Sequence, residues 1–231
     1  MNKSAATGAA AEPAHGSLSP CDTVLSVFDL GPAPSGKPLV PTHKQRMSVD
    51  MLGETPSIGC WDRPGTGKTL TMTLHALHAM CTGGPKQWVV LTPPAVIVNW
   101  AKFLRGITVR STGKPLQVLE YLGSKRGDSN LRAYHFIAMS YEVFKRDYER
   151  LTSALLEGNP NGVGLICDEG HKVKNLSTAN YRHVKGWQLQ GAPIKLATGT
   201  PLTSPLDIFA YTRFKNPDAY PTGRNLYGFD P

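Results

Sequence analysis

The chain has 231 residues, 40% of them hydrophobic and 18% charged, with a formal net charge of +8. This composition is ordinary for a soluble globular protein, and the length suits one large domain or a domain with a tail. No run approaches ~18 consecutive apolar residues, which excludes a membrane-spanning helix, and the N-terminal residues lack a secretion signal. The four cysteines form no C-x-x-C pair, so we expect free thiols and a location in the cytoplasm, in a host cytoplasm for a phage protein, or in a eukaryotic nucleus.

The basic residues are unevenly placed along the chain. Residues 1–40 contain two lysines and three acidic residues, so residues 41–231 carry a net charge of +9. A basic folded body favours a polyanionic partner such as a nucleic acid, although a lysine-rich soluble surface would explain the same charge.

The N-terminal segment is small, polar and broken by Pro and Gly. It cannot bury enough apolar surface to offset the entropy lost on ordering. We therefore expect residues 1–38 to form a flexible tail and linker, with a short apolar element of uncertain type at 22–30. The folded domain is expected over residues 39–231.

From about residue 39 the chain alternates between short apolar runs and helical patterns. The runs lack polar alternation, which is typical of strands buried on both faces. They cover 57–61, 87–92, 116–122, 135–140, 163–168 and 194–198. The helical patterns cover 68–81, 94–105 and 141–157. This alternation predicts an α/β fold with a mainly parallel sheet, in which ligands bind beyond the C-terminal ends of the strands.

The stretch "CWDRPGTGKTL" (60–70) is similar to a phosphate-binding loop. It fits the pattern G-x-x-x-x-G-K-[ST] except that Asp62 stands at the first glycine position. The main-chain N–H groups expected to surround a β-phosphate, at the start of the following helix, are those of Gly65, Thr66, Gly67 and Lys68. The Lys68 side chain would reach the β- and γ-phosphates, and the Thr69 hydroxyl would bind Mg²⁺. A glycine-rich turn would explain the glycines but not the Lys-Thr pair.

A second motif, "VGLICDEGHKVKN" (163–175), is an apolar run that ends in acidic residues. Asp168 is expected to hold the Mg²⁺ of a bound nucleotide, and Glu169 to orient or deprotonate the attacking water. An isolated Asp-Glu pair would more simply be a solvated loop. With the phosphate loop on the same chain, the pair predicts an ATP site in which His171 couples the γ-phosphate to other elements.

Three sequences, "DRPGTGKT", "DEGHKVKN" and "LATGTPLTSPLDIF", occur in this order and carry a family resemblance. They resemble motifs I, II and III of superfamily 2 helicases, and are most similar to the Swi/Snf-type ATPase branch, where Asp is common at the position of Asp62. The resemblance covers about residues 39–229. It implies a three-layer RecA-like P-loop domain, the first of two motor domains, with ATP and Mg²⁺ as cofactors. Gly170 departs from the pattern, which usually has Ala.

The resemblance also implies further site residues. "PTHKQRMSVDML" (41–52) resembles the segment that carries the adenine-reading glutamine, which would be Gln45. Thr198 and Thr200 of "TGTP" would link the γ-phosphate site to the DNA side.

DNA backbone contacts are implied in two segments, at Thr92, Pro93 and Pro94 and around Ser140 and Tyr141. Thr hydroxyls and helix N-termini are good phosphate donors. Basic side chains that could add charge are Lys125, Arg126, Lys172, Lys174, Arg182 and Lys185. Trp100 is expected in the core. No segment resembles a base-reading element, so we expect binding to duplex DNA that ignores sequence and weakens with salt.

The implied function is the ATP-binding half of a DNA-dependent ATPase that translocates on duplex DNA. A second RecA-like domain, in cis or in trans, would supply the arginine finger, so this chain alone is expected to be nearly inactive. Two alternatives remain open. One is a nucleotide- and DNA-binding module without significant turnover, and the other is a strand-separating superfamily 2 helicase. We expect no membrane partner.

Overall fold

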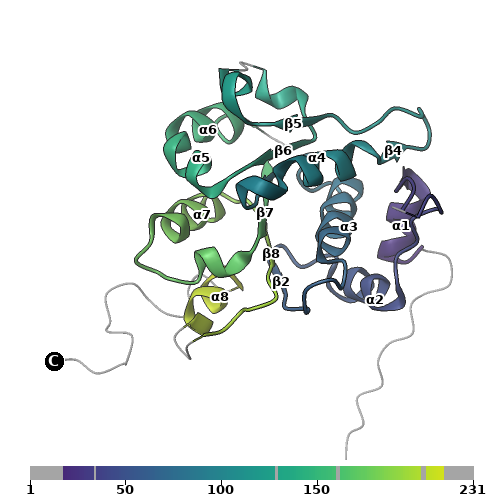
Figure 1. The fold of residues 1–231 in the computed structure, drawn as a ribbon, viewed down its shortest axis with the longest axis horizontal. Helices are drawn as coiled ribbons and strands as arrows, with labels where there is room; N and C mark the ends of the chain where they lie inside the picture. The colour runs from purple at the N-terminus through teal and green to yellow at the C-terminus, as the bar shows by residue number, and fades with distance from the viewer. Residues whose placement is uncertain (1–17, 34, 128–129, 160–161, 204–206, 216–231) are drawn as a thin grey trace, which may run out of the picture.

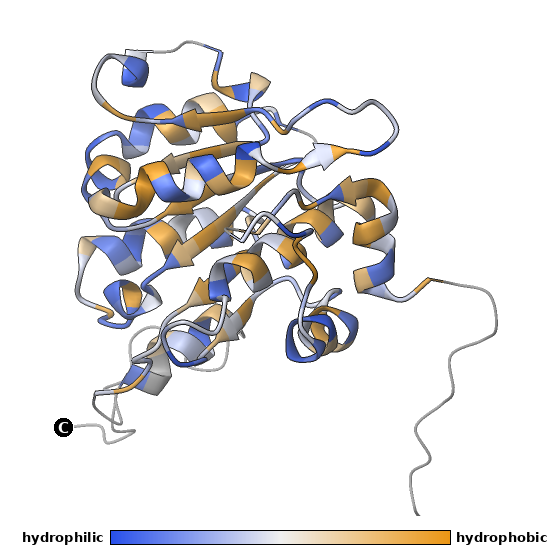
Figure 2. Ribbon diagram, turned by 45° about the vertical axis from the view of Figure 1, so that its right-hand side comes forward, coloured by the Kyte–Doolittle hydropathy of each residue, from blue (hydrophilic) through white to orange (hydrophobic). Residues whose placement is uncertain are grey.

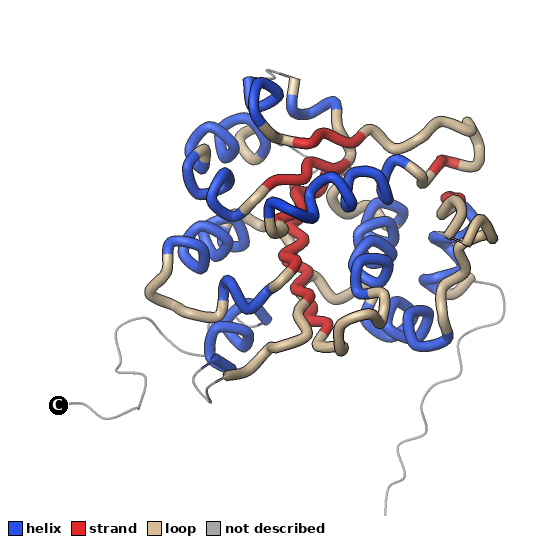
Figure 3. Tube along the Cα trace, in the orientation of Figure 1, coloured by secondary structure: helices blue, strands red, loops and turns tan. Residues whose placement is uncertain are grey.

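A six-stranded parallel sheet forms the centre of the protein (Figure 1). The computed structural model describes residues 18–33, 35–127, 130–159, 162–203 and 207–215. The strands are β2 (Ile58–Cys60), β3 (Gln87–Leu91), β5 (Val118–Glu120), β6 (Phe136–Met139), β7 (Val163–Asp168) and β8 (Ile194–Ala197). They lie in the order β2-β8-β7-β3-β6-β5. Figure 3 colours the strands red.

Helices cover both faces of this sheet. On one side lie α1 (Pro20–Val27), α2 (His43–Leu52), α3 (Lys68–Cys81) and α4 (Ile97–Arg105). On the other side lie α5 (Tyr141–Arg146), α6 (Tyr148–Leu155), α7 (Ala179–Leu189) and α8 (Asp207–Lys215). Strand side chains alternate between the two cores, since Trp88 and Val90 pack with the first group and Val89 and Leu91 with the second. Both faces of the strands are therefore apolar (Figure 2).

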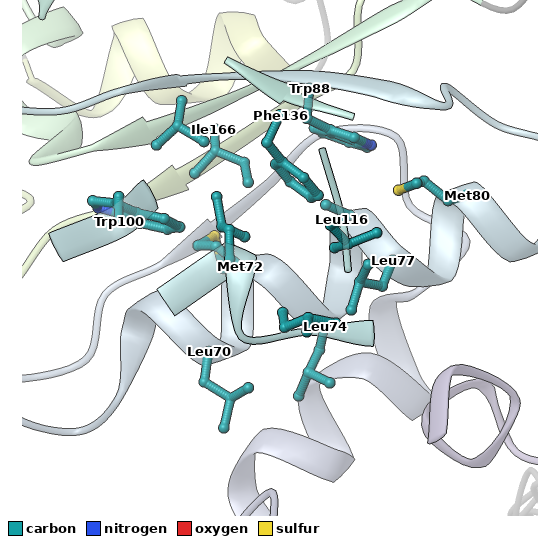
Figure 4. Close-up of a cluster of buried hydrophobic side chains, with 14 of the residues drawn as sticks. Leu70, Met72, Leu74, Leu77, Met80, Trp88, Trp100, Leu116, Phe136 and Ile166 are labelled. Atoms are coloured by element: carbon teal, nitrogen blue, oxygen red, sulfur yellow. The ribbon is translucent and has the colours of Figure 1, made fainter. Parts of the chain in front are cut away.

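Helix α3 is buried on nearly all sides. Leu70, Leu74 and Leu77 pack in the same cluster as Trp88 and Phe136 of the sheet (Figure 4). Its other sides pack against α1 and α2. Because these contacts hold α3 in place, they also fix its N-terminus, which lies beyond the C-terminal end of β2.

Shorter elements complete the described chain. β1 (Phe28–Asp29) pairs antiparallel with β4 (Thr108–Val109) in a separate two-stranded sheet. Four 3₁₀ turns are η1 (Pro94–Val96), η2 (Gly123–Gly127), η3 (Leu131–Ala133) and η4 (Gly170–Val173). In the part of the chain that the structure describes, no helix has the length and apolar character needed to cross a membrane.

The six strands and the helix at 68–81 confirm the sequence predictions. The helix expected at 141–157 is instead divided at Asp147, which has φ −101° and ψ 18° and separates α5 from α6. The Asp147 carboxylate accepts hydrogen bonds from Arg126 Nε (2.8 Å) and from the Tyr121 hydroxyl (3.1 Å). This interaction with distant residues holds Asp147 where a continuous helix would otherwise run. Helices α2, α7 and α8 were not predicted from the apolar pattern.

The N-terminal region corrects one expectation. Residues 22–30 were expected to be a short apolar element of uncertain type within a flexible tail and linker of 1–38. Residues 22–29 belong to α1 and β1, and Cys21 and Val24 of α1 are fully buried in the core. The Cys21 main-chain N–H donates to Asp50 Oδ1 of α2 (2.8 Å), and Arg46 pairs with Asp22. Ser19 is the N-cap of α1, and its hydroxyl accepts from the Asp22 main-chain N–H (3.2 Å). A polar residue that was assigned to the flexible tail therefore starts a helix. Residues 1–17 lie outside the described residues.

Candidate nucleotide site

The predicted motifs meet at one edge of the sheet, where the parallel strands end. The phosphate loop follows β2, Thr92 follows β3, Ser140 follows β6, Asp168 ends β7 and Thr198 follows β8. Crevices at this edge are the usual ligand sites of open parallel sheets.

The phosphate loop has the backbone that its sequence predicts. Gly65 and Gly67 both have φ +81°, a left-handed conformation that glycine adopts readily. Gly67 is the N-cap of α3, so the positive end of that helix begins at Lys68. The Lys68 ammonium folds back over the loop and donates to the carbonyl oxygens of Asp62 (2.9 Å) and Arg63 (3.1 Å).

Asp62, which stands at the first glycine position of the pattern, does not disrupt the loop. Among the described residues, Glu169 is the one non-glycine residue with positive φ, so the backbone at Asp62 does not need glycine. The Asp62 carboxylate pairs with Lys44 of α2. Its side chain therefore adds a link between α2 and the loop.

Gln45 supports the loop from α2. It is 7% exposed, and its Oε1 accepts from the Thr42 main-chain N–H (2.8 Å) in a capping box. Its Nε2 donates to the carbonyl oxygen of Gly67 (3.2 Å). Both ends of the amide thus bind the main chain, and its adenine-reading role stays a prediction.

The acidic motif is held by buried donors. Asp168 Oδ2 accepts from Thr92 Oγ1 (2.9 Å) and from Trp100 Nε1 (2.8 Å), while Oδ1 accepts from the Glu169 main-chain N–H (3.0 Å). Glu169 has φ 52° and ψ 51°, a conformation that is rare for a residue with a side chain. Such strain is frequent at functional sites.

His171 connects the acidic motif to "TGTP". Its Nδ1 lies 3.2 Å from Thr198 Oγ1 and 3.2 Å from Glu169 Oε2. The Thr200 main-chain N–H donates to the same Thr198 hydroxyl (3.2 Å). At Gly170, a Cβ would meet Leu196 Cβ at 3.4 Å, so the alanine that is usual in the family would fit.

The oxygen donors of the site fit a magnesium ion. Mg²⁺ prefers oxygen ligands and usually takes one or two from the protein, with phosphate and water completing its shell. The Thr69 hydroxyl at the start of α3 and the Asp168 carboxylate at the end of β7 are donors of this kind. Among the residues with a described position, no three His, Cys, Asp or Glu side chains gather to form a separate metal site.

Three of the residues implied in DNA contacts have buried side chains, so contact there would have to come from the main chain and stays a prediction. The side chains of Thr92, Ser140 and Tyr141 are buried, at 0%, 4% and 1% exposure. Ser140 Oγ caps α5 by accepting from the Val143 main-chain N–H (3.1 Å). The Tyr141 hydroxyl donates to the Asp168 carbonyl oxygen (2.8 Å), and burial raises its pKa well above the usual value. These side chains hold the ends of the strands, whereas Pro93 is half-buried and stays a candidate contact.

The basic candidates also divide into two groups. Arg126 and Lys174 form ion pairs, with Asp147 and Asp207 respectively. Lys185 Nζ donates to the Arg213 carbonyl oxygen (2.7 Å). Lys125 and Arg182 are exposed, and Lys172 is half-buried.

Comparison with known families shows which family the chain belongs to. The family model of the SNF2-related domain matches residues 57–225, which include all three motifs. This chain belongs to the SNF2-related domain family. The SNF2-related domain is a helicase-like ATPase domain, in agreement with the motif resemblance.

Several curated relatives share this domain. A DNA repair and recombination protein RAD54-like of Drosophila virilis is 29% identical over 184 residues, which are 71% of this chain and 22% of that protein. The DNA repair and recombination protein RAD54 of Oryza sativa subsp. japonica is 29% identical over 191 residues, 72% of this chain and 18% of that protein. Helicase SWR1 of Cryptococcus neoformans is 28% identical over 151 residues, 63% of this chain and 11% of that protein.

Solved structures confirm the RecA-like α/β fold. The SWI2/SNF2 ATPase core of Sulfolobus solfataricus in complex with dsDNA has a TM-score of 0.62 at 22% identity and covers 78% of this chain. The Hef helicase domain of Pyrococcus furiosus has a TM-score of 0.59 at 16% identity and covers 76%. This chain spans 36% of each of these structures and about a fifth of the RAD54 relatives.

Sequence reasoning missed residues that bind the predicted site residues and hold them in place. Trp100 was expected only in the core, and the ion pair between Lys44 and Asp62 was not foreseen. A polar atom on an otherwise apolar helix face, as in Trp100, is the one signal that the sequence offered, because a buried indole N–H usually has a partner.

Proposed function

We propose that this chain is the ATP-binding half of a DNA-dependent ATPase that translocates on duplex DNA. The observation that carries the proposal is the convergence of the phosphate loop, Asp168 and the His171–Thr198 pair at one edge of the sheet in an SNF2-related domain. Each group matches a separate requirement of phosphoryl transfer.

The residues take complementary roles in this proposal. Main-chain N–H groups from Gly65 to Lys68 surround the β-phosphate, and the Lys68 ammonium leaves the two carbonyl oxygens it now contacts for the β- and γ-phosphates. Thr69 and Asp168 would hold Mg²⁺, which supplies charge neutralisation between the β- and γ-phosphates. Glu169 orients the attacking water and accepts its proton. His171 contacts both Glu169 and Thr198, and so couples a change at the γ-phosphate to "TGTP".

A cavity beside the phosphate loop suits the nucleoside. It has a volume of about 320 Å³ and lies between α2 and the loop, lined by Lys44, Gln45, Met47, Trp61 and Thr66 among others. An apolar wall with a few polar groups is the usual character of such sites. Gln45 lines this cavity and is the proposed adenine-reading residue, and its amide also holds the loop at Gly67.

DNA binding is proposed as sequence-independent. The body carries +9, and a neighbouring fold was solved as an ATPase core in complex with dsDNA. Exposed Lys125, Arg182 and Pro94, with half-buried Lys172 and Pro93, are the candidate side-chain contacts. Phosphate contacts of this kind carry no sequence information.

The proposal includes a second RecA-like domain, in cis or in trans, which would supply the group that neutralises charge on the far side of the γ-phosphate. The other readings, a binding module without turnover and a strand-separating helicase, use the same site and differ in what that partner does. A nuclear or cytoplasmic location suits a protein that acts on DNA.

Nucleotide binding tests the proposal. A fluorescent ATP analogue titrated with Mg²⁺ should bind weakly to the wild-type chain, and Lys68→Ala should abolish binding, because this ammonium is the cation proposed to reach the β- and γ-phosphates. Lys102→Ala, on the exposed face of α4, serves as the matched control and should bind as the wild type does. Equal binding by wild type and Lys68→Ala would remove the phosphate loop from the site.

A further inference from the structure

The metal-binding carboxylate of Asp168 has two unequal oxygens. Oδ2 accepts from two buried side chains, the Thr92 hydroxyl (2.9 Å) and the Trp100 indole N–H (2.8 Å). Within the described part of the chain, Oδ1 accepts only from the adjacent Glu169 main-chain N–H (3.0 Å). Two donors occupy the lone pairs of Oδ2, so Oδ1 is the oxygen left to face a cation.

Trp100 is a rigid donor. It is 2% exposed and lies in the same cluster as Met72 and Ile166 (Figure 4). The helix that carries it, α4, also buries Ile97, Ala101 and Leu104, so packing fixes the position of the indole. An indole N–H donates and cannot accept, so in this contact the Asp168 oxygen is the acceptor.

The carboxylate would have freedom without these donors. Asp168 is half-buried at the end of β7, and its side chain could rotate to present either oxygen or both. Outer residues that hydrogen-bond to a ligating carboxylate commonly orient it, and their loss typically weakens metal binding about 10- to 100-fold.

We propose that Trp100 is a positioning residue that, together with Thr92, locks Asp168 so that Oδ1 alone faces Mg²⁺. This inference rests on the proposed nucleotide site, and it assigns a function to a residue that the sequence placed in the core. Thr92 and Trp100 are eight positions apart in the chain, with η1 between them, and both donate to the same oxygen atom.

A tryptophan that merely fills the core would behave differently. Loss of its N–H would lower stability without changing how nucleotide binding depends on Mg²⁺. The chain offers a matched comparison in Trp187, whose Nε1 donates to Thr152 Oγ1 (2.8 Å) in the buried core on the other face of the sheet.

The experiment measures the Mg²⁺ midpoint of nucleotide binding in the full 231-residue chain. A fluorescent ATP analogue is titrated at a series of Mg²⁺ concentrations and in EDTA. For Trp100→Phe we expect a midpoint about 10- to 100-fold higher than in the wild type, with the affinity in EDTA unchanged. For Trp187→Phe we expect the wild-type midpoint. A wild-type midpoint in Trp100→Phe would overturn the inference.

A second pair of variants keeps the test decisive if Trp100→Phe does not fold. Thr92→Val removes the other donor to Oδ2, and Thr92→Ser retains a hydroxyl. A raised Mg²⁺ midpoint in Thr92→Val but not in Thr92→Ser supports the lock on Oδ2, and equal midpoints overturn it. If the wild-type chain bound no nucleotide at all, the proposed function and this inference would both be wrong. Binding by the wild type with unchanged midpoints in the variants would refute the inference alone.

Discussion

The Gln45 side-chain amide donates to the Gly67 carbonyl oxygen across 3.2 Å, which joins α2 to the last residue before α3. The same amide accepts from the Thr42 main-chain N–H at the start of α2. One buried side chain therefore caps a helix and holds the phosphate loop in its left-handed conformation.

Replacing this amide by a carboxylate separates the two functions. Gln45→Glu keeps an acceptor for Thr42 but places an oxygen against the Gly67 carbonyl. We expect a free energy of unfolding lower by about 1–3 kcal/mol, because a carboxylate oxygen at the buried position 45 would face the Gly67 carbonyl oxygen with no donor between them, and a weaker nucleotide affinity. Urea unfolding and analogue titration measure both. Gln190→Glu, at an exposed position at the end of α7, should change neither by much. Unchanged nucleotide affinity in Gln45→Glu would separate α2 from the site.

Much of the fold could be predicted from the sequence, because strands buried on both faces leave uninterrupted apolar runs. The run that ends at Asp168 is an example, with Val163 to Cys167 all buried. The division at Asp147 could not be predicted, because its cause is a contact with Arg126 and Tyr121 from another part of the chain.

Parts of the site that are contiguous in sequence could be predicted. The direction of individual side chains could not, because tertiary contacts determine it. Gly67, Lys68 and Thr69 are adjacent in sequence, so their pattern alone predicts a glycine-containing loop at the start of a helix, which is what the structure has. Thr92 was expected on a DNA surface, but its hydroxyl points inward to Asp168. The direction of the Thr92 side chain depends on which strand lies next to β3. A single sequence does not show which strand that is.

Buried His75 predicts a pH dependence of stability. Burial, followed by the nearby positive charge of Lys195 and then by His78, lowers its pKa from 6.5 to about 3. Its Nε2 lies 3.0 Å from Ser48 Oγ. The folded state disfavours the charged imidazole, so its contribution is fully favourable above pH 6.5 and is lost as the pH falls from 6.5 toward 3.

Urea unfolding at several pH values tests this group. Below its unfolded pKa, His75 should cost up to about 1.4 kcal/mol of stability per pH unit. Carboxylates and other histidines titrate in the same range, so the measured quantity is the difference between wild type and His75→Gln. That difference should shift in favour of His75→Gln as the pH falls. His43→Gln, at an exposed position, should show no comparable shift, and a constant difference for His75→Gln would contradict the assignment.

The charge of the body predicts how DNA binding responds to salt. Filter binding to duplexes of unrelated sequence should give equal affinities that fall steeply with salt, because each phosphate contact contributes about 0.9 to the slope of log affinity against log salt. The double variant Lys125→Ala, Arg182→Ala should lower that slope by up to about 2 without creating a sequence preference. Lys37→Ala, outside the basic body, is the control. A flat salt response, or strong preference for one duplex, would reject sequence-independent phosphate binding.

The central claim is that this chain holds an ATP site that needs a second domain for turnover. The most direct test is to measure phosphate release by residues 1–231, with and without duplex DNA, in the wild type and in Glu169→Gln. Lys68, Thr69, Asp168 and Glu169 supply the phosphate cradle, the metal oxygens and the water, but the proposal places the arginine finger on a second domain. Such a finger is worth about 10³–10⁵ in rate. The predicted result is ATP binding with release near background in both proteins and no stimulation by DNA. Release at about 1 s⁻¹ or faster by wild type, lost in Glu169→Gln, would contradict the half-site and indicate a complete ATPase, formed by self-association of this chain.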